Sequence, residues 1–148
     1  GCQLVATCDL AIAEETTTFG VNGVNIGLFC STPMVALSRN IPKKQAFEML
    51  TTGEFITAER AKTLGLINRI SNLENLDEQT EKFAETIASK LGSAVKIGKE
   101  AFYKQLEMPI AQAYEYTGQV MTENMMLRQT EKGIEAFLNK LEPAWEQD

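Results

Sequence analysis

Hydrophobic and polar positions divide the chain into two compositional regions. Small, β-branched and glycine-punctuated residues dominate the first 40 positions, whereas helix-forming and charged residues dominate from position 42 onward. Near the start, the segment 1–7 predicts a small-residue helix, and the apolar run 9–13 has the length of a buried strand. The stretches 16–21 and 24–26 are bounded by glycines and predict short strands or turns, and 66–70 predicts one more strand.

Helical patterns fill the rest of the chain. Thr32 and Pro33 predict an N-cap followed by proline at the first helical position, and we expect Pro42 to start the next helix. One face of that next helix carries three apolar residues: Ala46, Phe47 and Leu50. Thr57 is predicted to cap a third helix, which closes at Gly65.

Several more helices are predicted in the second half of the chain. Asn75 with Glu78 resembles a capping box, and helices are also predicted over 94–106 and 109–127. The helix after Asn75 carries an apolar stripe made of Phe83, Ala84, Ile87, Ala88 and Leu91. The last helix carries apolar residues at i, i+3, i+4 and i+7: Ile134, Phe137, Leu138 and Leu141.

Composition limits the size and the class of the protein. The 148 residues are 44% hydrophobic and 23% charged, which allows one ordinary core and therefore one domain or a piece of one. The formal net charge is −6 and the basic residues are scattered, so no nucleic-acid partner is expected. No apolar run approaches the roughly 20 residues that span a bilayer, so no membrane contact is expected either. The chain also lacks an initiator methionine, which suggests a fragment whose targeting peptide would lie upstream.

The chain contains no histidine, and this excludes several kinds of site within it. Histidine is the usual proton carrier near neutral pH and the commonest metal ligand, so a Ser-His-Asp triad, a Cys-His pair and a histidine-built zinc site are ruled out. The three cysteines, Cys2, Cys8 and Cys30, form no Cys-x-x-Cys pair. We therefore expect reduced thiols, an intracellular protein and no metal.

Three blocks of sequence carry a family resemblance. The first is Gly-Cys-Gln-Leu at 1–4, with Cys-Asp at 8–9, Phe-Gly at 19–20 and Gly-Leu at 27–28. The second is Thr-Thr-Gly-Glu-Phe-Ile-Thr-Ala at 51–58 with Gly-Leu-Ile at 65–67, and the third is Glu-Lys-Gly-Ile-Glu-Ala-Phe-Leu at 131–138. As a set they resemble the crotonase (enoyl-CoA hydratase/isomerase) family, and the resemblance covers the whole chain.

The resemblance implies an α/β fold and a CoA thioester ligand. It implies that 1–70 is the C-terminal part of a crotonase-like ββα spiral and that 71–148 is a helical trimerisation region, which gives a homotrimer or a dimer of trimers. In the family, two backbone N–H groups bind the thioester carbonyl oxygen and stabilise the enolate. Both donors are expected upstream of this chain, and CoA enters only as part of the thioester, without a further cofactor.

The family's two catalytic glutamates are replaced in this chain. The first aligns with Gln3, whose amide cannot act as a carboxylate base, and the second aligns with Gly23, which has no side chain. The only carboxylates between positions 1 and 47 are Asp9, Glu14 and Glu15, and none of them offers a replacement base. Because one general acid or base contributes about 10²–10⁴ in rate, we expect binding without efficient hydration.

Other candidate positions have structural alternatives. By resemblance, Phe137 lies near the CoA adenine and Lys140 pairs with phosphate; core packing is favoured for Phe137, whereas Lys140 lies off the apolar stripe and is the better ligand candidate. Gln3 could orient a thioester or water, or could make only local hydrogen bonds. Cys30 could be a nucleophile beside the acyl group, but without a basic partner a structural role is favoured.

Three hypotheses of function follow. The first is an acyl-CoA-binding protein of fatty acid metabolism that lacks efficient hydratase activity. The second is an active CoA-thioester isomerase, hydrolase or decarboxylase that uses an upstream base, since fold alone does not choose the chemistry. The third is a non-catalytic trimeric assembly module with a vestigial pocket. The resemblance predicts a mitochondrial location; the alternative is the cytoplasm.

Overall fold

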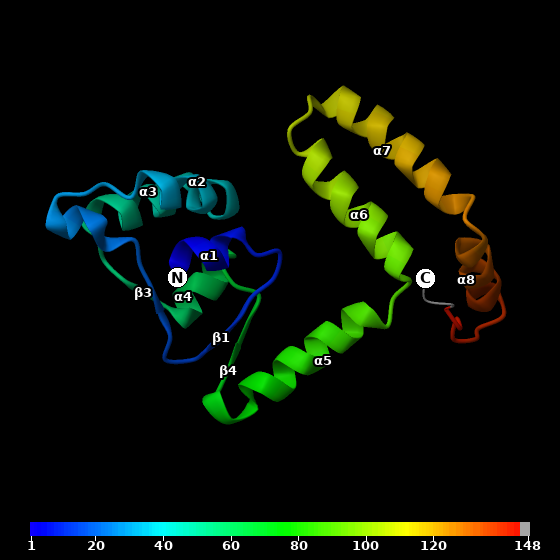
Figure 1. Ribbon diagram of the computed structural model, residues 1–148, viewed down its shortest axis with the longest axis horizontal. Coiled ribbons are helices and arrows are strands. Elements are labelled where there is room, and N and C mark those ends of the chain that lie inside the picture. The colour runs from blue at the N-terminus through cyan, green and yellow to red at the C-terminus, as the bar shows by residue number, and fades with distance from the viewer. Residues whose placement is uncertain (146–148) are drawn as a thin grey trace. The chain divides into compact units, whose positions relative to one another are not determined.

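The computed structural model describes residues 1–145, which fold into two compact units. The first unit is Gly1–Lys82 and the second begins at Phe83, as the colours of Figure 1 allow the reader to follow. The division into a spiral core over 1–70 and a trimerisation region over 71–148 stays a prediction, because it concerns the roles of the two parts rather than their internal contacts.

Helices alternate with very short strands in the first unit. Its elements are α1 (Cys2–Thr7), β1 (Ile12–Glu14), β2 (Thr18–Phe19), the 3-10 helix η1 (Asn22–Ile26), α2 (Ser31–Asn40), α3 (Lys43–Thr52), β3 (Ile56–Thr57), α4 (Ala58–Leu64), β4 (Arg69–Ser71) and the 3-10 helix η2 (Leu73–Asn75). Helix α5 (Leu76–Ala88) runs from the first unit into the second, which holds α6 (Gly92–Gln105), α7 (Ile110–Met125) and α8 (Arg128–Leu138).

Two strand pairs join distant parts of the first unit. Strands β1 and β4 are parallel, with Ile12 opposite Arg69, and β2 and β3 are antiparallel, with Phe19 opposite Ile56. Both strands of the parallel pair begin later than their apolar runs predict. Before β4, Leu66 and Ile67 are apolar because they are buried in the core, although they precede the strand; before β1, Leu10 is 44% exposed.

One local prediction in the first unit is wrong, and an open one is decided. Of the two alternatives for 24–26, the turn is correct, since the segment belongs to the 3-10 helix η1. The predicted N-cap is wrong, because α2 begins at Ser31 with Cys30 as its N-cap in place of Thr32. Pro33 therefore lies at the third helical position. It is tolerated there because the first four N–H groups of a helix have no partner within the helix.

The core of the first unit contains buried side chains from α2, α3 and α4. Leu37 and Leu50 are its largest fully buried side chains, and Ala58 and Ala61 of α4 are fully buried as well. The predicted core face of α3 is wrong in one position, since Phe47 is 63% exposed whereas Met49 is 3% exposed. The inward face of α3 is therefore Ala46, Met49 and Leu50.

The end of α3 is fixed by a glycine. Gly53 has a φ of 66°, in the left-handed region that favours glycine, and the Asn25 side chain donates to its carbonyl oxygen at 3.4 Å. A Cβ atom at this position would lie 2.5 Å from Asn25 Oδ1. The contact joins η1 to α3 and so helps to hold the segment that contains position 23.

Helices α6 and α7 pack against each other as a hairpin in the second unit. These two helices confirm the predicted helices over 94–106 and 109–127 to within a few residues. The capping box is wrong: Asn72 Oδ1 accepts from the Asn75 backbone N–H at 2.9 Å, and Glu78 instead pairs with Lys82 at 2.6 Å. This hydrogen bond and the charge of Lys82 lower the pKa of the Glu78 carboxyl.

The two predicted apolar stripes of this unit are only partly correct. In the first, Ala84 and Ala88 are exposed, and Leu91 is buried but follows the end of α5. In the second, Leu141 lies beyond the end of α8, and the Phe137 side chain is 80% exposed. Core packing of Phe137 is therefore wrong for this chain.

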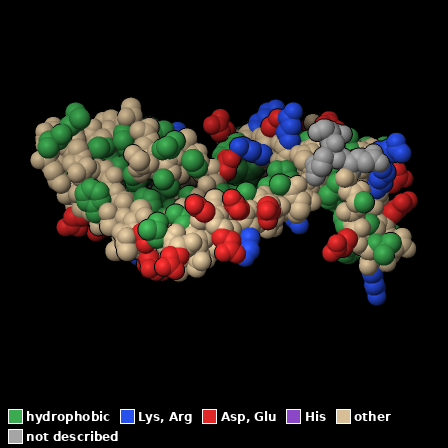
Figure 2. All heavy atoms as spheres, turned by 60° about the horizontal axis from the view of Figure 1, so that its bottom comes forward, with side chains coloured by type: hydrophobic (Ala, Val, Ile, Leu, Met, Phe, Trp, Pro, Cys, Tyr) green, Lys and Arg blue, Asp and Glu red, His purple; other side chains and the backbone are tan. Residues whose placement is uncertain are grey.

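Apolar and charged groups share the surface. Figure 2 shows hydrophobic side chains open on the visible face and Lys and Arg side chains dispersed over it rather than gathered in one patch. Within residues 1–145, no helix is both long and apolar enough to cross a membrane. Nor does any group of three or more His, Cys, Asp or Glu side chains in this range have an arrangement that could hold a metal ion.

Candidate functional site

Gln3 lies in the first turn of α1, and its side chain is exposed. Its backbone carbonyl accepts a hydrogen bond from Thr7 Oγ1 at 2.8 Å, which helps to hold the short helix together. The side-chain amide can donate and accept hydrogen bonds but has no proton to exchange near neutral pH. At this position the chain can therefore orient a polar group and cannot remove a proton from carbon.

The neighbouring residue ties α1 to the chain after β2. The Cys2 thiol packs against the core of the first unit, and the Gly20 backbone N–H donates a hydrogen bond to it. Burial raises the pKa of this thiol above its ordinary value, while the hydrogen bond from the Gly20 amide acts in the opposite direction. Cys2 is thus a packing residue, and the protonated thiol is its resting form.

Position 23 has no room for a side chain. A Cβ atom built on Gly23 would lie 2.8 Å from Cys30 Sγ and closer still to the carbonyl oxygen of Leu28. The Leu28 backbone N–H in turn donates to the Gly23 carbonyl oxygen at 3.0 Å, so the backbone folds back on itself here. The glycine is therefore required by close packing, because sulfur and backbone atoms fill the space beside it.

Cys30 was singled out from the sequence as a residue beside the acyl group, but the sequence did not show what it touches. It is half-buried at the N-cap of α2 and packs against the same core as Cys2. The structure thus brings Gly23 and Cys30 together. Sequence spacing could not reveal this contact, because it depends on the turn of η1 and on the backbone at 28.

Phe137 and Lys140 lie in the second unit, at the end of α8. The Lys140 backbone N–H donates to the Phe137 carbonyl oxygen at 3.1 Å, and Lys140 has a φ of 57°. The Leu141 N–H then bonds the Ala136 carbonyl oxygen at 2.9 Å and reverses the chain. Both candidate side chains are exposed, so both are available to a ligand from solvent.

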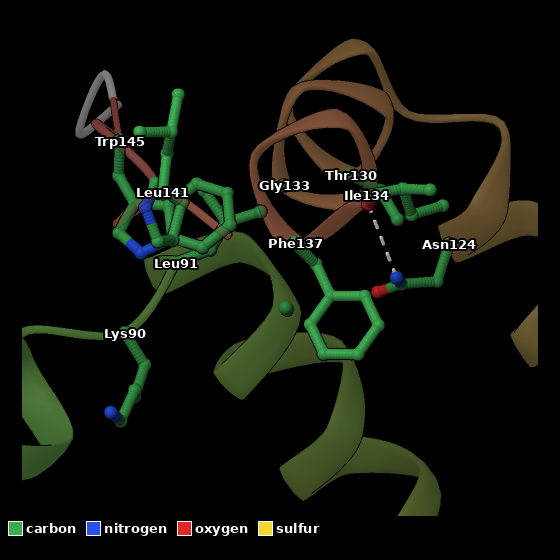
Figure 3. Close-up of a pocket in the computed structure, with 11 residues that line it drawn as sticks. Lys90, Leu91, Asn124, Thr130, Gly133, Ile134, Phe137, Leu141 and Trp145 are labelled. Carbon is green, nitrogen blue, oxygen red and sulfur yellow. Dashed lines mark hydrogen bonds between the residues drawn. The ribbon is translucent and has the colours of Figure 1, made fainter. Parts of the chain in front are cut away.

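The second unit also contains an apolar cavity of about 500 Å³, shown in Figure 3. Leu91 and Ala94 at the start of α6 line one side, and Ile134 and Phe137 of α8 line another. The Trp145 ring lies so close to Gly133 that a Cβ atom there would come within 2.5 Å of it. This cavity was not predicted, because the tail that reverses after α8 supplies part of its lining.

Electrostatics distinguish the two candidate regions. No Asp, Glu, Lys or Arg occurs in the sequence between Thr16 and Ser38, so the segment around Gly23 and Cys30 is uncharged. Lys140 at the end of α8, by contrast, offers a cation that suits a phosphate group. The first region therefore contributes no charge of its own, whereas the second contributes one cation.

Comparison with known proteins identifies the family to which this chain belongs. The profile of the enoyl-CoA hydratase/isomerase family matches residues 1–148, and the chain belongs to this family. Its solved relatives share the crotonase fold, so the expected α/β fold is confirmed.

Particular relatives narrow the comparison. The chain is 48% identical over 145 residues to the mitochondrial enoyl-CoA hydratase domain-containing protein 3 of Homo sapiens. These residues make up 98% of this chain and 48% of the relative. The crystal structure of that human protein superposes with a TM-score of 0.92 and covers 97% of this chain and 57% of the solved chain. The crystal structure of an enoyl-CoA hydratase from Mycobacterium smegmatis is 51% identical in sequence and superposes with a TM-score of 0.95. The match covers 98% of this chain and 56% of the solved chain. The chain spans about half the length of the curated relatives it matches.

Proposed function

We propose that the protein binds acyl-CoA thioesters in fatty acid metabolism and lacks efficient hydratase activity. The observation that carries the proposal is that Gln3 has an amide and Gly23 has no space for any side chain. By resemblance, these are the two positions that align with the family's catalytic glutamates. Membership of the enoyl-CoA hydratase/isomerase family supports the thioester ligand.

In the proposed complex the chain's own groups bind rather than transfer protons. Lys140 pairs with a CoA phosphate, and the exposed Phe137 ring contacts the adenine. Hydration needs a group that activates water and a group that handles the α-proton. Neither Gln3 nor Gly23 can do either task, so the bound thioester is retained unchanged. Apart from CoA within the ligand, no cofactor takes part.

Crotonyl-CoA hydration by the full-length protein tests the proposal. We expect a kcat/KM at least about 10²-fold below that of an active bacterial enoyl-CoA hydratase measured beside it, since one lost acid or base costs that much. Isothermal calorimetry should show micromolar binding of butyryl-CoA by the same preparation. The Gln3→Glu variant should hydrate faster than the matched Gln112→Glu control on α7. A wild-type rate within tenfold of the active hydratase overturns the proposal.

The two other hypotheses give different results in the same experiments. An active isomerase, hydrolase or decarboxylase would turn over one member of an acyl-CoA panel and lose this activity when an upstream acidic residue is replaced. A vestigial pocket would show no butyryl-CoA binding in calorimetry. The geometry at positions 3 and 23 favours neither hypothesis. The active enzyme would need a base outside this chain, and the vestigial pocket is defined only by the absence of ligand binding.

We also propose a homotrimer and a mitochondrial location. The trimer is supported by an apolar stripe on α7, whose members are all more than half exposed: Ile110, Tyr114, Met121 and Met125. An exposed stripe of this kind marks a protein interface in a water-soluble chain. The location is supported by the curated names of the related proteins, which include the word mitochondrial. Fluorescence microscopy of the tagged full-length protein checks the location.

A further inference from the structure

The turn that ends α8 carries a lysine at a position where glycine is usual. The backbone N–H of Lys140 donates to the Phe137 carbonyl oxygen at 3.1 Å, and the next N–H along the chain donates to the Ala136 carbonyl oxygen at 2.9 Å. These two bonds form a Schellman motif, whose left-handed residue is most often glycine. Here that residue is Lys140, with a φ of 57°, and no other non-glycine residue in the described range 1–145 has a positive φ.

This backbone conformation is unfavourable for lysine, because the Cβ atom of an L-residue crowds the following carbonyl oxygen when φ is positive. A lysine near a helix C-terminus does interact favourably with the helix dipole. The dipole alone would be satisfied by a lysine at position 139, whose φ is −87°, followed by an asparagine, which tolerates the left-handed conformation. The observed order is Asn139 and then Lys140. Strained backbone of this kind is concentrated at functional sites.

The tail after this turn is anchored on α8 by an aromatic ring. Trp145 is half-buried, and its ring lies against Gly133, about two helical turns before Lys140 (Figure 3). The contact is so close that a Cβ atom at position 133 would come within 2.5 Å of the ring, so glycine permits it. Leu141 and Trp145 of the tail line the same apolar cavity as Phe137. The reversal at Lys140 is therefore held by backbone bonds on one side and by the ring on the other.

We propose that Trp145 is a positioning residue, which clamps the tail onto α8 and holds Lys140 in the conformation that presents its ammonium group to a phosphate of the acyl-CoA ligand. The proposal rests on the proposed acyl-CoA binding and deepens it. Trp145 acts through the turn and does not contact the ligand. Because the turn is formed before the ligand arrives, binding loses less conformational entropy, and loss of the clamp weakens the affinity.

Calorimetry with the full-length protein and butyryl-CoA tests the link between the two residues. Trp145→Ala should weaken binding about tenfold and Lys140→Ala at least as much, while the double variant should bind no more weakly than Lys140→Ala alone. Trp145→Phe keeps a ring and should recover most of the affinity. Phe102→Ala is the control, because it removes an exposed ring of α6 that contacts Tyr103 instead of the tail, and it should bind like wild type.

The strain at Lys140 is tested by two substitutions that both remove the charge. In the full-length protein, Lys140→Gly should melt about 3 °C above Lys140→Ala, because glycine adopts the left-handed conformation freely and alanine does not. Both variants should lose the same butyryl-CoA affinity. Equal melting temperatures for the two variants would overturn the proposal, since a turn without strain needs no clamp.

Trypsin tests the clamp without any ligand. Trp145→Ala in the full-length protein should speed cleavage of the bond between Lys140 and Leu141 about tenfold, because the released turn opens more often. Trp145→Phe and Phe102→Ala should be cut at nearly the wild-type rate, as followed by mass spectrometry of the peptide that begins at Leu141.

The outcomes separate this proposal from the proposed function. Wild-type affinity in Trp145→Ala overturns the positioning role, as does a Trp145→Ala loss that persists in full when Lys140 is already alanine, because the ring would then act independently of the lysine. An unchanged rate of cleavage after Lys140 overturns the clamp. If the wild-type protein binds no butyryl-CoA, the proposed function itself fails, and the cleavage rates still decide whether Trp145 holds the turn.

Discussion

Thr57 shows how one side chain sets a helix boundary in this protein. Its hydroxyl oxygen accepts a hydrogen bond from the Arg60 backbone N–H at 3.2 Å, and α4 begins directly after it. The same segment enters the core immediately, because Ala58 and Ala61 on the inner face of α4 are fully buried. The cap therefore secures both the start of the helix and the packing of its first turn.

Replacing this cap should be measurable. Thr57→Ala is expected to lower the free energy of unfolding by about 1 kcal/mol, since one helix N–H loses its partner. Thr57→Ser keeps the hydroxyl and should lie close to wild type. Thr63→Ala is the control. Thr63 also lies in α4, but its hydroxyl only donates to the Glu59 carbonyl oxygen of the preceding turn, so its loss should change the free energy of unfolding little. Urea denaturation compares the four proteins, and a Thr57→Ala value equal to the control would show that the cap contributes nothing.

The sequence predicted single residues well where the cause is local. The Thr57 cap and the helix end at Gly65, with its φ of 82°, are confirmed because cap chemistry depends on a few neighbouring residues. The Asn75–Glu78 capping box failed for a reason that is equally local. Asn72 begins a 3-10 turn three residues earlier, and it bonds the Asn75 N–H before the helix starts.

Elements were predicted with unequal success. Helices α6 and α7 were found because their apolar periodicity extends over many residues, whereas β1 and β4 have three residues each and were placed too early. Their register depends on pairing with a partner about 57 residues away, as the Ala11 N–H bond to Asn68 Oδ1 illustrates. An apolar run indicates the neighbourhood of a strand, and the ladder partner decides which of its residues form the strand.

Helix α8 depends on a contact that its own sequence does not show. The Trp145 ring rests against Gly133, so Gly133→Ala should displace the ring even though alanine is the better helix former. Trp145 is the one tryptophan of the 148 residues, and its fluorescence therefore reports on this cavity. We expect a red-shifted emission for Gly133→Ala in this chain and an unchanged emission for Gly98→Ala. Identical spectra for all three proteins would contradict the stacking.

For the molecule as a whole, the sequence showed that positions 3 and 23 carry no carboxylate, but not how the space at position 23 is filled. The absence of carboxylates at Gln3 and Gly23 could be read from residue identity together with the family resemblance. That Leu28 and Cys30 fill the space at Gly23 required coordinates, because a backbone oxygen and a thiol meet there through a turn. Close packing between segments is a property of the fold and leaves little trace in composition.

The proposed trimer can be tested on α7. At 100° per residue, Ile110, Tyr114, Met121 and Met125 fall on one side of this helix and Gln119 falls on the other. Met121→Glu and Gln119→Glu each add one negative charge, yet only the first would bury that charge in an interface without a partner, at a cost of several kcal/mol. Light scattering after size-exclusion chromatography of the full-length protein should therefore give a trimer mass for wild type and for Gln119→Glu, and a smaller mass for Met121→Glu. If both variants keep the wild-type mass, the α7 stripe does not form the subunit contact.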